Sequence, residues 1–203
     1  MKNIHLILFM TKKKILEEYG EIYKEYLNDD ENAYNDFKKH RITNFNTQNV
    51  KDLSAIFSYC KLLSLIYLSS LNAENIEDMS HMFNGLNLLT SVDLSNFDTN
   101  NVNTMHSKFA DCSNLTDIDL SNFETKNLRS MGLMFKNCYS LNSIDMSHFD
   151  TQLVSSMYGL FLNCVSLTSL DLSNFRTRNA LNMNFAFLWL FKIRIYRYDL
   201  FYR

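Results

Sequence analysis

The chain has 203 residues, 46% of them hydrophobic, which is enough apolar material for one continuous core. Its formal net charge of -2 argues against a nucleic-acid-binding protein, because such proteins usually carry a clear basic excess. Proline is absent and glycine occurs only four times, so the turns are expected to be built from Asn, Asp, Ser and Thr.

The N-terminal segment lies outside the pattern that organises the rest of the chain. An apolar run at 4–10 resembles the start of a signal peptide, but it is short and leads into three lysines without a small-residue cleavage site. We expect no secretion by this route, and no stretch approaches the length of a membrane span. Apolar residues at helical spacing over 15–27, and a second segment near 33–39, predict an N-terminal helical cap over 1–41.

From residue 42 onward a pattern returns every 26 residues, in three series of apolar positions. The first series is Phe45, Leu71, Phe97, Phe123, Phe149 and Phe175. The second is Leu53, Met79, Met105, Met131, Met157 and Met183, and the third is Phe57, Phe83, Phe109, Phe135, Phe161 and Phe187. A fixed period of this length predicts a stack of similar units that bury one continuous core.

Residues 89–114 represent one unit of the stack. Over 89–97, apolar residues are separated by small polar residues or aspartate, which predicts a short strand with one buried edge. Over 102–112, apolar residues stand at i, i+3, i+7 and i+10, which predicts a short helix held by packing against its neighbours. The predicted fold class is therefore an α/β solenoid, with a parallel sheet on one face and short helices on the other.

The C-terminal residues 191–203 lose the Asn/Ser/Asp pattern but keep the apolar register. Adding 26 to the apolar positions of the preceding strand leads to Ile193, Tyr196, Tyr198 and Phe201. We expect a degenerate terminal strand or cap. The alternative is a truncated or altered end whose register agrees by chance.

The strand segments LTSVDLSNF, LTDIDLSNF, LNSIDMSHF and LTSLDLSNF resemble those of leucine-rich repeats. Together with the following NFDTNNVNTMHSKFADCSNL, the unit resembles the 26-residue repeats of BspA-like leucine-rich-repeat surface proteins. The resemblance implies a leucine-rich-repeat solenoid over 42–190 and a role in adhesion or partner binding at the cell surface. Phenylalanine stands where the commonest leucine-rich repeats carry Asn or Cys, so we expect an aromatic column in place of the usual asparagine ladder.

The outward strand position carries aspartate in four successive units, followed two residues later by serine. The candidate partner-binding residues are Asp93, Asp119, Asp145 and Asp171, with Ser95, Ser121, Ser147 and Ser173. Stacked carboxylates are able to raise one another's pKa, to recruit a cation or to bind a basic partner. The simplest interpretation is a solvated strand face on which each aspartate bonds nearby hydroxyls and amides, and we assign no metal to the row.

The four cysteines share one position of the repeat, which leucine fills in two other units: Cys60, Leu86, Cys112, Cys138, Cys164 and Leu190. We therefore expect buried free thiols, and not metal ligands, since no CxxC pair supplies the spacing of a zinc site. The basic residues are expected to lie on a solvated surface; they include Lys108, Lys126, Arg129, Lys136, Arg176 and Arg178.

Catalysis has little support in the sequence. His81, His106 and His148 occupy different positions of the repeat, so no nucleophile and base converge by spacing. We expect no enzyme activity, no catalytic residue and no cofactor.

These expectations combine into a non-enzymatic protein–protein interaction module of the bacterial surface or adhesion type, which binds a host or cell-surface protein through its polar strand face over 90–173. The alternative is a truncated or diverged repeat fragment, or an intracellular scaffold, with no binding activity of its own. The resemblance implies the cell surface, whereas the short apolar run at 4–10 leaves the cytoplasm as the alternative localisation. The sequence names neither the partner nor the oligomeric state.

Overall fold

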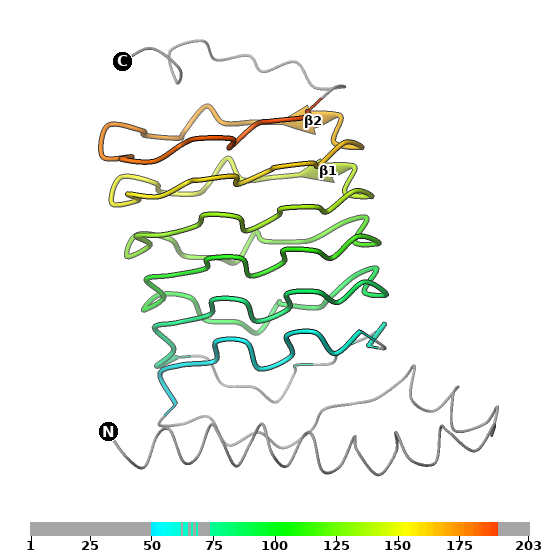
Figure 1. Ribbon diagram of the computed structural model, residues 1–203. Helices are drawn as coiled ribbons and strands as arrows, with labels where there is room; N and C mark the ends of the chain where they lie inside the picture. Colours follow the sequence, from blue (N-terminus) through cyan, green and yellow to red (C-terminus); the bar gives the residue numbers. More distant parts are fainter. Residues whose placement is uncertain (1–49, 62, 65, 67, 69–73, 191–203) are drawn as a thin grey trace, which may run out of the picture.

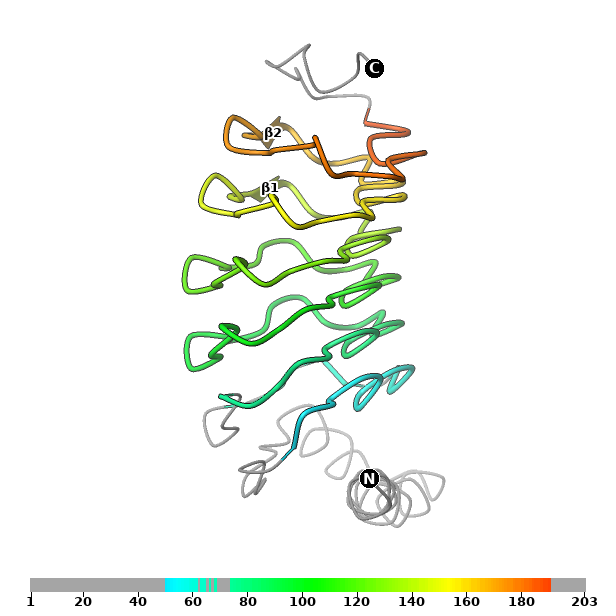
Figure 2. The ribbon, with the colours of Figure 1, turned by 90° about the vertical axis from the view of Figure 1, so that its left-hand side faces the viewer.

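The computed structural model describes residues 50–61, 63–64, 66, 68 and 74–190. Over these residues the chain winds into coils that lie one upon another along a single axis (Figures 1 and 2). The predicted cap at 1–41 and the predicted terminal strand at 191–203 lie outside the described residues, as does the beginning of the predicted solenoid at 42–49.

One long side of each coil, which we call the strand side, comprises residues 90–95, 116–121, 142–147 and 168–173. It contains the short strands β1 (Ser143–Ile144) and β2 (Ser169–Leu170), which pair in parallel. Ser143 lies opposite Ser169 and Ile144 opposite Leu170, so the register equals one repeat. Backbone hydrogen bonds join the other coils at the same side, as from Thr116 N–H to the Thr90 carbonyl (3.2 Å).

The other long side, which we call the turn side, comprises residues 52–60, 78–86, 104–112, 130–138, 156–164 and 182–190. It forms the corrugated edge at the right of Figure 2, away from β1 and β2. The amide of His81 donates to the carbonyl of His106 in the next coil (2.8 Å), whereas the amide of Asn84 donates back to the carbonyl of His81 (3.1 Å). Parallel bridges join the start of the turn side in successive coils, through Asp52, Asp78, Thr104, Ser130, Ser156 and Asn182.

The helix that the sequence predicted over 102–112 is replaced by consecutive turns, and no described residue is helical. Residues at two positions of each turn side have positive φ, such as Ser107 (54°) and Asp111 (61°), and an L-residue in this conformation interrupts a right-handed helix. Alternate amides therefore leave their own coil and bond to the next one. Tight turns bring apolar side chains inward every three or four residues, as a helix does, so the pattern alone does not separate the two.

The core fills the space between the strand side and the turn side. The turn side contributes a column of stacked rings whose neighbouring centroids are 5.2 to 5.7 Å apart: Phe57, Phe83, Phe109, Phe135 and Phe161. A second buried series of the predicted period comes two residues after the strand side in each coil: Phe97, Phe123, Phe149 and Phe175. The described coils thus bury the apolar positions that the period identified, except that Met183 and Phe187 in the last coil are only partly buried. Most polar residues lie at the surface and at the corners.

Candidate binding surfaces

The four predicted aspartates each close a turn at the end of the strand side. Their Oδ1 atoms accept a hydrogen bond from the backbone N–H of the serine two residues ahead. The pairs are Asp93 and Ser95 (3.0 Å), Asp119 and Ser121 (2.9 Å), Asp145 and Ser147 (2.9 Å), and Asp171 and Ser173 (2.8 Å). This Asx turn holds each carboxylate at a set place in its coil, while all four aspartates remain exposed.

The serine contacts dominate the electrostatics of the row. Hydrogen bonds from the backbone and side chain of Ser95 lower the pKa of Asp93, and they outweigh the smaller upward effect of Asp119. In the other three aspartates too, the hydrogen bonds from the backbone and side chain of the serine are the largest causes, and their pKa values are lowered. Mutual repulsion therefore does not raise these pKa values above their ordinary range, as the stacked charges alone suggested, and all four carboxylates are ionised at neutral pH.

Adjacent coils are joined next to this row by side chains that reach back along the axis. Asn122 Nδ2 donates to the carbonyls of Leu94 (2.9 Å) and Phe97 (3.1 Å). In the next coil His148 takes the same position, with Nε2 2.9 Å from the carbonyl of Leu120. These contacts hold successive aspartates in register, and the charge of His148 further lowers the pKa of Asp119 and Asp145.

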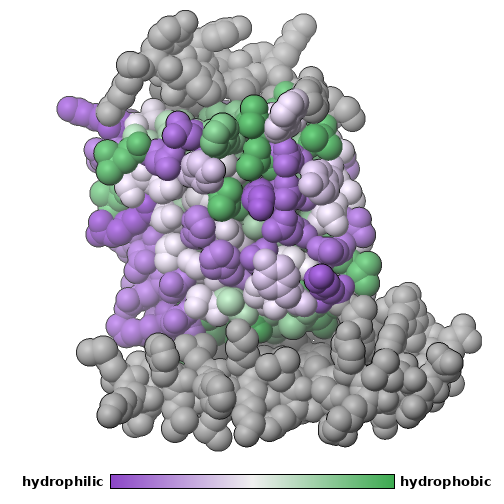
Figure 3. Space-filling view, viewed as in Figure 1, coloured by the Kyte–Doolittle hydropathy of each residue, from purple (hydrophilic) through white to green (hydrophobic). Residues whose placement is uncertain are grey.

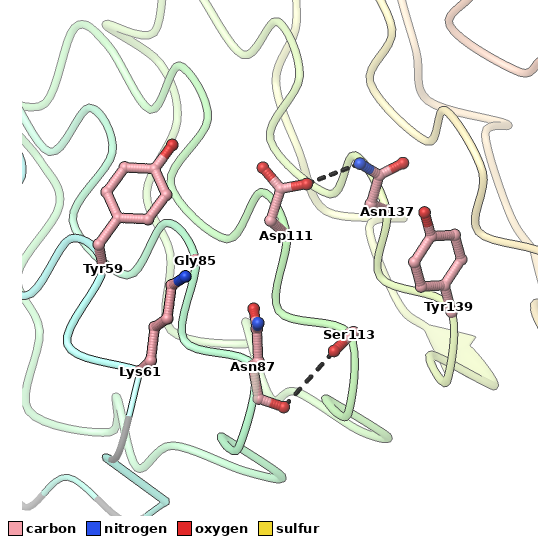
Figure 4. A pocket seen from close by; sticks show the side chains of 8 residues that line it. All are labelled: Tyr59, Lys61, Gly85, Asn87, Asp111, Ser113, Asn137 and Tyr139. Atoms are coloured by element: carbon pink, nitrogen blue, oxygen red, sulfur yellow. Dashed lines mark hydrogen bonds between the residues drawn. The ribbon is translucent and has the colours of Figure 1, made fainter.

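A second surface feature, which sequence reasoning did not single out, is a groove where the turn side leads into the strand side of the next coil (Figure 4). We call it the Tyr59–Tyr139 groove; its volume is about 340 Å³. It is lined by Tyr59, Lys61, Gly85, Asn87, Asp111, Ser113, Asn137 and Tyr139. These residues occupy two positions of the repeat, two residues apart, in each of four coils. Their polar character alone is also typical of an ordinary solvated corner.

Tyrosines stand at the two ends of the groove with polar side chains between them (Figure 4). In the middle, Asn137 Nδ2 donates to Asp111 Oδ1 (2.6 Å). Gly85 makes room for the ring of Tyr59, because a Cβ on this residue would lie 2.6 Å from a ring carbon, and its φ of 77° also favours glycine. The Tyr59 ring can therefore lie where it does only because Gly85, one coil away, has no side chain.

Lys108 does not lie on a solvated surface, so this prediction was wrong. Its side chain is 0% exposed and takes the core position that Met82 and Met134 fill in the adjacent coils. Its Nζ lies 3.1 Å from Met79 Sδ and 4.5 Å from the centroid of the Phe123 ring. Burial lowers the pKa of Lys108 to about 7, and no carboxylate of a described residue forms an ion pair with its ammonium group.

Cys112, Cys138 and Cys164 are free and fully buried thiols, as predicted, whereas Cys60 is only partly buried. Each buried Sγ donates to a backbone carbonyl of the preceding coil: Cys112 to Phe83 (3.1 Å), Cys138 to Phe109 (3.2 Å) and Cys164 to Phe135 (3.0 Å). Burial raises the pKa of Cys112 and Cys164 to about 12 and that of Cys138 well above its ordinary value. These thiols are therefore protonated and unreactive at neutral pH.

The three histidines in the described part of the chain lie at two separate places. The rings of His81 and His106 meet edge to face with centroids 5.4 Å apart, whereas His148 lies beside the aspartate row. Among the described residues, no three His, Cys, Asp or Glu side chains are grouped so as to hold a metal ion. Nor does that part of the chain contain a helix long and apolar enough to cross a membrane.

Exposed apolar side chains gather in the last described coil. They are Leu181, Phe185, Leu188 and Trp189. Figure 3 shows the face that Figure 1 turns toward the viewer, where hydrophobic residues are concentrated in the upper half of the described part and polar residues below. This surface directly precedes residues 191–203, which lie outside the described range.

A comparison with protein families relates the whole stack to known sequences. The model of the DUF285 family, described as Mycoplasma protein of unknown function, matches residues 27–143 and again residues 86–194. The first match alone covers more than half of the chain, so the protein belongs to this family of repeat proteins. Comparisons with curated proteins and with solved structures found no significant match.

Proposed function

We propose that this protein is a non-enzymatic binding module that presents its strand side to the basic surface of a protein partner. The observation that carries the proposal is the row of four exposed carboxylates, each held by its own Asx turn and ionised at neutral pH. Coils paired in parallel lie about 4.8 Å apart, so the row extends over roughly 14 Å. An array of this length suits a protein surface better than a small molecule, and its charge selects a basic one.

We propose further that the coils are a variant of the leucine-rich-repeat solenoid, and that the protein acts at the cell surface. The 26-residue register and the parallel pairing on the strand side support the first point. The resemblance to BspA-like repeats supports the second. A diverged fragment or an intracellular scaffold without binding activity is the competing hypothesis, and the experiment below distinguishes it from a binding module.

The decisive variant is the double substitution Asp119→Asn and Asp145→Asn. Asparagine keeps the Oδ1 acceptor for the serine amide, so the turns are preserved while two charges are removed. We expect the affinity for the partner to fall about 2- to 10-fold, more at low salt than at high salt. The measurement is the quantity of each protein that immobilised wild type and variant retain from a cell extract.

The matched control is Asp98→Asn with Asp150→Asn, which removes two charges from Asx turns outside the row. The Oδ1 atoms of Asp98 and Asp150 accept from the amides of Asn100 (2.8 Å) and Gln152 (2.9 Å). This control should retain the same proteins as the wild type. Equal retention by all three proteins would contradict binding through the aspartate row, and no retained protein at all would favour the fragment hypothesis.

A further inference from the structure

The Tyr59–Tyr139 groove combines two exposed tyrosines with a polar floor, and its lining does not include the aspartate row. Its two tyrosines are large side chains that remain accessible, with 61% of Tyr59 and 45% of Tyr139 exposed. They come from different coils and stand at opposite ends of a polar floor (Figure 4). Exposed aromatic rings that flank fixed polar groups are characteristic of surfaces that bind ligands.

The backbone of the floor is already hydrogen-bonded, so recognition falls to side chains. The amide of Gly85 donates to the carbonyl of Ala110 (2.8 Å), and the amide of Asp111 to that of Lys136 (2.7 Å). The carbonyls of Asp111 and Gly85 accept from the Asn87 amide nitrogen, at 2.9 and 3.2 Å, when the amide is turned toward them. A peptide therefore finds no free strand edge here to pair with.

The polar side chains of the floor are held in place by one another. Asn137 Nδ2 donates to Asp111 Oδ1, and Asn163 Nδ2 donates to Asn137 Oδ1, both at 2.6 Å. An amide has a second N–H and a carboxylate a second oxygen, so this pair presents a donor and an acceptor side by side. Lys136 Nζ lies 4.0 Å from Asp111 Oδ2 and offsets the charge of the carboxylate. The exposed Lys61 adds a positively charged hydrogen-bond donor at the Tyr59 end of the groove (Figure 4).

We propose that the Tyr59–Tyr139 groove binds a short carbohydrate chain. Sugar hydroxyls both donate and accept hydrogen bonds, which matches the Asp111–Asn137 pair, and the apolar C–H face of a sugar ring packs against an aromatic ring. The tyrosines are three coil spacings apart along the axis, or roughly 14 Å, which suits a chain of a few sugar units. Proline-rich peptides also dock in aromatic-lined grooves without pairing as strands. The fixed donor and acceptor of the Asp111–Asn137 pair favour a ligand rich in hydroxyl groups, and a peptide is the competing outcome of the test.

The test is calorimetric titration of the full chain with maltotriose, cellotriose and triacetylchitotriose. We expect at least one of them to bind. Tyr139→Ala should weaken its binding about tenfold, whereas Tyr139→Phe, which keeps the ring, should change it less than about twofold. Asn137→Ala tests the floor independently. Tyr158→Ala is the matched control, because Tyr158 packs edge-on against Phe185 outside the groove and should leave binding unchanged.

Thermal unfolding of each variant shows whether weaker binding results from a missing contact or from unfolding of the protein. If Asn137→Ala does not fold, the comparison of Tyr139→Ala with Tyr139→Phe decides the result. The proposal is overturned if none of the three saccharides binds at about 10 mM, a concentration at which even weak sites fill. It is also overturned if Tyr139→Ala and Asn137→Ala both bind the saccharide as tightly as the wild type does. A hydrophilic Ser/Gly/Asn peptide that binds instead, with the same loss in Tyr139→Ala, would assign the groove to peptides and overturn the carbohydrate class.

Discussion

Lys108 shows how one residue changes the energetics of an otherwise uniform stack. Aromatic rings surround its Nζ, with centroids of Phe123, Phe97 and Phe109 at 4.5, 5.3 and 5.6 Å. Ring faces attract a cation, but they do not replace the water or the carboxylate that a buried ammonium requires. The coil that contains Lys108 therefore carries a cost that coils with methionine at this position do not.

We predict that Lys108→Met stabilises the protein at and below neutral pH. The pKa of Lys108 is about 7 in the folded protein, whereas an unfolded lysine titrates near about 10.4, so the unfolded chain binds more protons between these values. Above about pH 10.4 the lysine is neutral in both the folded and the unfolded state and costs no stability through protonation. As the pH falls from about 10.4 to about 7, the unfolded chain gains a proton that the folded protein does not, so the free energy of unfolding decreases. The variant should gain on the order of several kcal/mol at pH 6, measured by urea unfolding.

The comparison with the variant is needed because the cysteines titrate in the same range. Their raised pKa values in the folded state lower the stability of both proteins as pH rises above the pKa of an unfolded thiol, about 8.5. The difference between wild type and Lys108→Met isolates the lysine. Lys126→Met, at an exposed position, is the control and should show no such difference. If the free energies of unfolding of wild type and Lys108→Met change in parallel from pH 6 to pH 10, the ammonium group of Lys108 is not desolvated as the structure indicates.

At the scale of the element, buried threonines determine the corner between the strand side and the turn side. Thr99 Oγ1 accepts from the amide of Glu124 (2.7 Å) and donates to its carbonyl (3.0 Å). Thr151 makes the same pair of bonds with Arg176 in the next coil, at 2.7 and 3.1 Å. Each of these hydroxyls therefore bonds to the backbone of a neighbouring coil and not to that of its own.

We predict that Thr151→Val destabilises the protein by about 1 to 3 kcal/mol. The substitution keeps the volume but leaves the amide and carbonyl of Arg176 without their partner at a buried corner. Thr168→Val is a suitable control, because Thr168 donates to the Asn142 carbonyl (3.1 Å) from an exposed position, where water can replace it. Its effect should stay within about 0.5 kcal/mol. If urea unfolding showed the same loss of stability in Thr151→Val and Thr168→Val, the hydroxyl of Thr151 would have no special role at the corner.

At the scale of the whole molecule, each coil contacts only the coils next to it, so stability should change by whole coils. We predict that deletion of residues 115–140, one complete repeat, yields a folded protein with a lower melting temperature, because Leu141 then occupies the place of Leu115. Deletion of half a coil, residues 115–127, should abolish the cooperative transition, since it carries polar residues into core positions. Circular dichroism during heating measures the melting temperature and the cooperativity of unfolding of both deletion variants. A folded half-coil variant would show that register does not control the stack.

The sequence by itself determined the period, the buried positions and the burial of the thiols. Each of these follows from one residue type recurring at one place, as with Phe83, Phe109 and Phe135, and stacking repeats a local environment in every coil. The sequence also located the aspartate row, although it did not reveal that Asx turns would lower the pKa values of these residues.

Only the tertiary structure decided between helix and turns, the place of Lys108 and the existence of the Tyr59–Tyr139 groove. An apolar spacing of three and four residues fits either local structure, and the choice depends on amides that bond to the next coil. Lys108 is buried because the neighbouring coils enclose its position. The groove is assembled from side chains of four coils, so no single repeat contains its pattern. These features arise from contacts between repeats, whereas a periodic sequence specifies the content of each repeat.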